Sequence, residues 1–170
     1  MNRDRYRKVI FWTLTLLHAG LIFYFSSQGG NKSMDTSGFL AEPLARWLMQ
    51  VFGIESSQYS EFLLQVQHLI RKTAHFLEYA VLGVWVVGLL DSYGIHRRIL
   101  LSVIVCGLYA ATDEWHQSVV SERTAQMTDV LLDTVGAAAG SVLGFYLWRY
   151  SRLRRNRDTE QNELKEKGNR

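Results

Sequence analysis

Four residues with reactive side chains stand where a long apolar run begins: Lys72, His75, Glu78 and Tyr79. They follow one another at steps of three, three and one. At 3.6 residues per turn, this spacing places most of them on one side of a helix. His75 and Glu78 can form a general acid–base pair, and Lys72 can hold an anionic group such as a phosphate.

Two later segments carry the same unusual combination of ionisable residues beside an apolar run. Asp129 and Asp133 are four residues apart and present two carboxylates on one helix face, and Asp113 and Gln117 have the same spacing. We therefore expect the three segments to meet in one polar site. The residues predicted to be catalytic are His75, Glu78, Asp113, Glu114 and Asp133, of which His75 and Glu78 are expected to do proton transfer or coordination. The residues predicted to bind a substrate are Gln28, Lys72, Tyr79, Gln117, Arg123 and Asp129.

Two other interpretations of these residues stay open. Carboxylates and imidazole bind divalent cations, and a Glu and a His three residues apart occur in metal-binding helical bundles. No spacing here is diagnostic in the way that HExxH is, so a divalent cation is not favoured. The residues can also join helices, for example through Glu78 paired with Lys72 or Arg123. Because ionisable groups are costly inside a membrane, ligand binding or chemistry is favoured over a purely structural role, but the sequence does not decide whether the protein is an enzyme.

Four apolar segments must position the site, at residues 9–25, 74–90, 99–112 and 130–148. A helix that spans a membrane needs about 20 residues, so the first and third segments are short. We predict an all-α membrane protein with four transmembrane helices, comprising a basic head at 1–8, a membrane domain at 9–148 and a polar tail at 149–170. The single cysteine, Cys106, lies inside an apolar run and excludes an intrachain disulfide.

Residues 29–73 form an insertion between the first two spans. We expect flexible chain at 29–33, followed by an amphipathic helix in which Leu40, Leu44 and Val51 share a face and which ends at Gly53. This helix is too polar to span, so we expect it to lie on the membrane surface or to cap the bundle. A second helix follows and can run on into the span at 74–90.

The distribution of basic residues predicts the orientation of the chain. Fourteen of the 19 Lys and Arg residues fall in the head, the turn at 91–98 and the tail, all of which lie on one side if there are four spans. The positive-inside rule then places both termini in the cytoplasm. Four polar clusters at the ends of the spans consequently share the outer membrane face: Ser26–Gln28, Lys72–Tyr79, Asp113–Gln117 and Asp129–Asp133. The chain has a high isoelectric point. Since the apolar runs leave no basic folded face, nucleic-acid binding is excluded as its explanation.

One helix face of the last span consists of small residues, because Gly136, Gly140 and Gly144 are four residues apart. Such a face allows close helix packing. We expect it to pack within the same chain, with a homo-oligomer as the second interpretation.

Taken together, the motifs resemble those of the VanZ-like family of small bacterial membrane proteins. The matching residues are Ser26–Gln28, Lys72–Tyr79 with Leu82 and Gly83, Asp113–Gln117, and Arg123 with Asp129, Asp133 and Gly136. The resemblance implies a four-helix integral protein of the bacterial cell envelope, and its namesake is an accessory factor in teicoplanin resistance. Asp133 stands where family members often carry Asn.

We expect a multi-pass protein of the bacterial cytoplasmic membrane. Its outward-facing site is predicted to bind or process an anionic envelope component, either a lipid-linked phosphate or a peptidoglycan precursor, and to affect glycopeptide susceptibility. The alternative is a non-catalytic binding or surface-shielding protein. A proton-coupled carrier is less favoured, because the spans carry almost no polar residues towards the cytoplasmic side.

Overall fold

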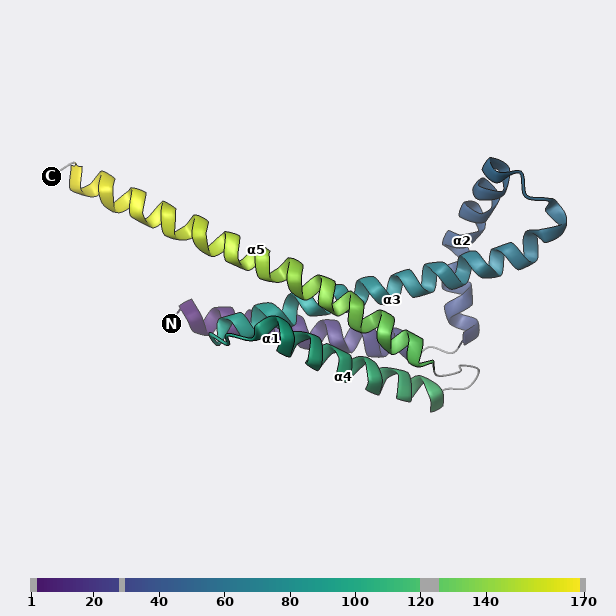
Figure 1. The fold of residues 1–170 in the computed structure, drawn as a ribbon, viewed down its shortest axis with the longest axis horizontal. Helices are drawn as coiled ribbons and strands as arrows, with labels where there is room; N and C mark the ends of the chain where they lie inside the picture. Colours follow the sequence, from purple (N-terminus) through teal and green to yellow (C-terminus); the bar gives the residue numbers. More distant parts are fainter. Residues whose placement is uncertain (1–2, 28–29, 120–125, 169–170) are drawn as a thin grey trace.

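The structure is a computed structural model that describes residues 3–27, 30–119 and 126–168. These residues form helices and connecting turns, and the described part of the chain contains no strand. The elements are α1 (Arg3–Ser26), α2 (Gly30–Phe52), the short 3-10 helix η1 (Ser56–Gln58), α3 (Tyr59–Ser92), α4 (Arg98–Val119) and α5 (Met127–Gly168). Helices α1, α3, α4 and α5 lie along one another as a bundle, and α2 crosses the N-terminal half of α3 (Figure 1).

Three helices in the described part of the chain are long and apolar enough to cross a membrane, at Asp4–Ser26, Ser56–Ser92 and Met127–Arg155. Large apolar side chains such as Leu16, Leu17 and Leu131 remain exposed on these helices, as expected for surfaces that face lipid. Helix α4 is less clear, because its apolar part ends before Asp113. Residues 99–112 give only about 21 Å of helix, against a hydrocarbon core of roughly 30 Å. The described residues are therefore all-α, with three clear candidate membrane spans where four are predicted from the sequence.

Helices α3 and α5 pack very closely because glycine lines their contact. A Cβ atom added at Gly140 would lie 1.8 Å from the carbonyl oxygen of Ala80, and one added at Gly136 would lie 2.4 Å from that of Phe76. Any larger side chain would therefore push the helices apart. The small-residue face thus packs against α3 of the same chain, while a homo-oligomer through these glycines stays a prediction.

The core of the bundle combines apolar side chains with small hydroxyls. Ile22, Leu82 and Cys106 are buried in one cluster. Ser102 and Ser141 are fully buried and their hydroxyls lie 2.8 Å apart, which links α4 to α5. Cys106 therefore behaves as a small buried apolar residue.

One predicted boundary differs from the structure, and one helix extends beyond its predicted span. Helix α2 begins at Gly30, so the flexible chain expected at 29–33 is wrong for residues 30–33. A helix that is already formed gains one hydrogen bond for each added residue, which lets α2 extend through these polar positions. Helix α5 continues from the last predicted span through the polar tail to Gly168.

The predicted amphipathic insertion is helical, and it packs on the first half of α3. Ala41 and Ala45 of α2 are fully buried against Val66 of α3. Gly53 ends α2 with φ of 66°, a left-handed conformation that glycine adopts without strain. Helix α3 then runs without interruption from the insertion into the bundle, which places Lys72–Tyr79 at the point where the bundle begins.

Candidate functional site

The predicted polar residues come together at the end of the bundle where α1 ends and α5 begins. A small pocket there is lined by Lys72, His75, Glu114, Gln117, Asp129, Leu132 and Asp133. Asp133 lies within electrostatic reach of Asp113 and Glu78, and Tyr79 lies within reach of Asp113 and Asp133. The structure thus unites nine of the eleven predicted site residues. Gln28 and Arg123 lie outside the described residues.

Polar contacts at the site join different helices. Lys72 of α3 forms an ion pair with Asp129 of α5. The Gln117 side-chain amide donates to Asp113 Oδ2 at 3.0 Å and to Ser26 Oγ at 2.7 Å, which links α4 to the end of α1. These contacts fix the helix ends relative to one another, so the site is assembled by tertiary packing.

His75 and Glu78 lie on consecutive turns of α3, with His75 Nδ1 and Glu78 Oε2 3.6 Å apart. This distance is within ion-pair range but longer than a hydrogen bond. Both side chains are about one quarter exposed, at 21% and 27%. The pair is therefore placed for proton exchange through a small movement of either side chain, as the spacing predicts.

Carboxylates outnumber cations at this end of the bundle. Four acidic side chains lie within electrostatic reach of Asp133: Glu78, Asp113, Glu114 and Asp129. Lys72 is the only Lys or Arg among the described residues that line the pocket. This concentration of acidic side chains makes this end of the bundle attractive to positive charge.

Glu114 lies just beyond the predicted third span and is buried. Burial raises the pKa of its carboxyl group, while a hydrogen bond from the backbone N–H of Gln126 to Oε1, at 2.5 Å, acts in the opposite direction. This contact also holds the start of the α5 segment against α4.

Three oxygens of the site are buried and unsatisfied. Tyr79 Oη, Asp113 Oδ1 and Asp133 Oδ1 have no hydrogen-bond partner among the described residues. Their side chains are 0%, 4% and 6% exposed. Buried polar groups in proteins nearly always have a partner, so these oxygens are available to donors or acceptors of a bound group. The pocket itself measures about 10 Å³, which is room for about one water molecule. A larger ligand must therefore displace side chains or bind over the mouth of the pocket.

The described residues contain no group of three or more His, Cys, Asp or Glu side chains arranged to hold a metal ion. The carboxylates share a site, but they are spread over separate helix ends. A divalent cation stays an open prediction that the sequence does not favour.

Sequence reasoning missed two residues that support the site. Ser26 is fully buried and accepts the hydrogen bond from Gln117, which was not among the contacts predicted for this residue. His18 Nε2 donates to the backbone oxygen of Glu78 at 2.9 Å and so joins α1 to α3. The signal for Ser26 was its place at the end of the first apolar run.

A second charged centre, at the opposite end of the bundle, was not predicted. Asp91 is buried and pairs with Arg7 of α1, with Arg98 Nη1 of α4 at 2.7 Å and with Arg152 Nη2 of α5 at 2.5 Å. The three arginines are 84, 7 and 61 residues away from Asp91 in the chain, so only the folded structure brings them together.

Comparison with known proteins returns one informative match. No curated protein and no solved structure matches the chain. Residues 11–149 match the family described as VanZ/LLP1. Because this match covers most of the chain and all the described site residues, the chain belongs to the VanZ/LLP1 family.

Proposed function

We propose that the chain is a multi-pass protein of the bacterial cytoplasmic membrane, with α4 as a fourth span and both termini in the cytoplasm. Family membership and the three clear candidate spans support the membrane location. The excess of Lys and Arg in the head, the 91–98 turn and the tail supports the orientation. In this orientation the polar site faces the outer side of the membrane.

We propose further that the polar site binds or processes an anionic envelope component, either a lipid-linked phosphate or a peptidoglycan precursor. The observation that carries this proposal is the set of buried, unpartnered oxygens of Tyr79, Asp113 and Asp133 inside a cluster of ionisable side chains. Buried groups of this kind are costly in a membrane protein unless a ligand uses them.

Each residue has a specific role in this proposal. Lys72, with Arg123, holds the phosphate by charge. His75 and Glu78 exchange a proton with the ligand. Gln117 and Tyr79 orient it by hydrogen bonds, with Gln28 as a further contact. Protonated carboxyl groups of the cluster donate hydrogen bonds to the anion, which makes the excess of acids compatible with phosphate binding.

A second candidate ligand is an ammonium group, such as an amine of a peptidoglycan peptide. The excess of carboxylates over Lys72 favours it, because a cation gains from every acid in the cluster. Binding of either ligand without chemistry would make the protein a shielding factor that lowers glycopeptide access to the cell surface.

Mass spectrometry of the purified, detergent-solubilised full chain tests ligand binding. We expect a phosphate-containing envelope component to copurify with the wild type and to be lost from Lys72→Met. Lys8→Met at the opposite end of the bundle is the matched control and should retain it. A wild type without such a component, or a Lys72→Met variant that keeps it, would contradict the anion proposal; an amine-bearing, phosphate-free ligand would favour the second candidate.

Variants of the proton-exchanging pair separate chemistry from binding. If the site is catalytic, His75→Ala and Glu78→Gln should each abolish the cellular effect on teicoplanin susceptibility while expression stays normal. If both variants protect cells as well as the wild type does, the protein acts without catalysis.

A further inference from the structure

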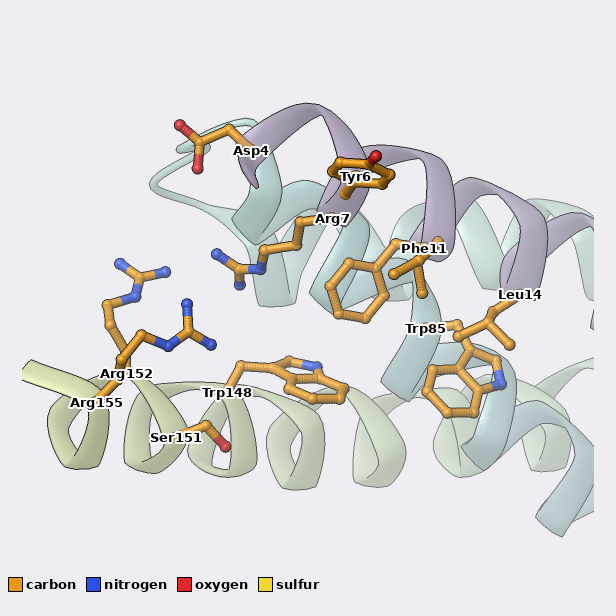
Figure 2. A pocket seen from close by; sticks show the side chains of 11 residues that line it. Asp4, Tyr6, Arg7, Phe11, Leu14, Trp85, Trp148, Ser151, Arg152 and Arg155 are labelled. Atoms are coloured by element: carbon orange, nitrogen blue, oxygen red, sulfur yellow. The ribbon is translucent and has the colours of Figure 1, made fainter. Parts of the chain in front are cut away.

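A groove of about 540 Å³ lies between α1, α3 and α5, at the end of the bundle opposite to the polar site (Figure 2). Arg7 and Ser26 mark the two ends on α1, and at 1.5 Å per residue they are separated by roughly 28 Å along the helix. The groove is therefore a separate feature, and nothing in the proposed function uses it.

The groove has two chemically different parts. Phe11, Leu14, Trp85 and Trp148 form an apolar wall along its length, while the guanidinium groups of Arg7, Arg152 and Arg155 gather at one end (Figure 2). Phe11 and Trp148 meet edge to face with their ring centroids 5.1 Å apart, so the aromatic wall is packed in place.

The charged end of the groove carries an excess of positive charge. Arg7 and Arg152 share Asp91 with Arg98, so one carboxylate faces three guanidinium groups. Arg152 is half exposed, at 50%, although it is paired. Arg155 and Asp4 also line the groove, so the side chains described at this end comprise four arginines, with Arg98, and two aspartates, with Asp91. This end is complementary to an anion.

We propose that the groove binds one anionic phospholipid. Its phosphate lies beside Arg152 and Arg155, where guanidinium groups offer paired donors to phosphate oxygens. One acyl chain lies along the apolar wall of Phe11, Leu14, Trp85 and Trp148.

The size and position of the groove favour a lipid over a free phosphate ion. A phosphate ion would fill a small part of 540 Å³, a volume within the usual range of about 300–1,000 Å³ for sites that bury a drug-sized ligand. The apolar wall would contribute nothing to binding a free ion. The neighbouring Ile10 is exposed on α1 and also lines the groove, so the groove opens onto a surface that lipid covers.

Native mass spectrometry of the purified full chain tests the proposal with phosphatidylglycerol and phosphatidylcholine that carry the same acyl chains. We expect the wild type to retain phosphatidylglycerol in preference to phosphatidylcholine, and millimolar inorganic phosphate not to displace it. Equal retention of the two lipids, or full displacement by phosphate, would overturn the proposal without the need for any variant.

Two variants locate the binding. Arg155→Gln should weaken phosphatidylglycerol retention roughly fivefold, which corresponds to the loss of one basic residue near an anionic lipid. Arg157→Gln is the matched control, because two residues turn the helix by about 200° and Arg157 therefore lies on the opposite side of α5. Leu14→Trp should fill the apolar part of the groove and reduce retention without changing the charge.

Equal losses in Arg155→Gln and Arg157→Gln would show general charge attraction and overturn the proposal, as would full retention by a folded Leu14→Trp variant. The test is independent of the polar site, since loss of an envelope component from Lys72→Met and loss of phosphatidylglycerol from Arg155→Gln are measured as different masses on different variants.

Discussion

The two ends of the bundle both bury charge, but they do so with opposite surpluses. At one end Asp91 is surrounded by Arg7, Arg98 and Arg152, and its carboxylate oxygens are fully used. At the other end several carboxylates share Lys72, and Asp113 and Asp133 each keep one oxygen without a partner among the described residues. A satisfied buried carboxylate holds helices together, whereas an unsatisfied one is available to a ligand.

The same substitution at the two ends should therefore have opposite effects on stability. Asp91→Asn leaves three arginines around a neutral amide and should lower the free energy of unfolding by about 3 kcal/mol, the lower end of the range for breaking a buried ion pair because Arg152 is half exposed. Denaturation of the detergent-solubilised protein measures this effect. Asp4→Asn at the same end is the control, since Asp4 is exposed and should change little. An unchanged stability of Asp91→Asn would refute the view of Asp91 as a structural link.

At the acidic end, Asp133→Asn should raise the free energy of unfolding by about 1 kcal/mol at neutral pH. The amide keeps the volume of the side chain and removes one buried acid from a cluster that contains Asp113, Asp129, Glu114 and Glu78. The measurement is the same denaturation experiment. If Asp133→Asn instead lost 1 kcal/mol or more, the ionised carboxylate would be part of the fold, and the two ends would not differ as proposed.

The smallest effect concerns the ion pair between Lys72 and Asp129. Their side chains are 23% and 32% exposed, so a double-mutant cycle with Lys72→Met and Asp129→Asn should give a coupling energy of up to about 1 kcal/mol. A weak coupling leaves Lys72 able to exchange Asp129 for an anionic ligand. A coupling of 3 kcal/mol or more would make this pair structural like Asp91 and would count against Lys72 as a binding residue.

Much of the polar site could be predicted because its residues lie beside apolar runs. Lys72, His75, Glu78 and Tyr79 interrupt the start of such a run, and helical periodicity then indicates which of them share a face. Asp113 and Asp133 stand out for the same reason. The distribution of basic residues predicts that these clusters share one end of the spans, and the structure unites the nine described members there.

Asp91 could not be recognised in this way, because the sequence predicts a short polar turn at 91–98, where a charged residue is unremarkable, whereas the structure places Asp91 in the last turn of α3. Its importance depends on Arg7 and Arg152, which come from the two ends of the chain. The groove beside it depends in turn on how α1 and α5 pack against α3. No local pattern carries that information.

The sequence by itself determined the all-helical class, the apolar segments and the placement of polar groups at their ends, since these follow from hydropathy and helical period. Only the tertiary structure decided which charges are neutralised and which are left in excess. That outcome depends on pairings between helices distant in the chain, such as Asp91 with Arg152, and on close contacts such as that of Gly140 with Ala80. The energy of a buried charge is determined by its neighbours in space, and these exist only once the helices have packed.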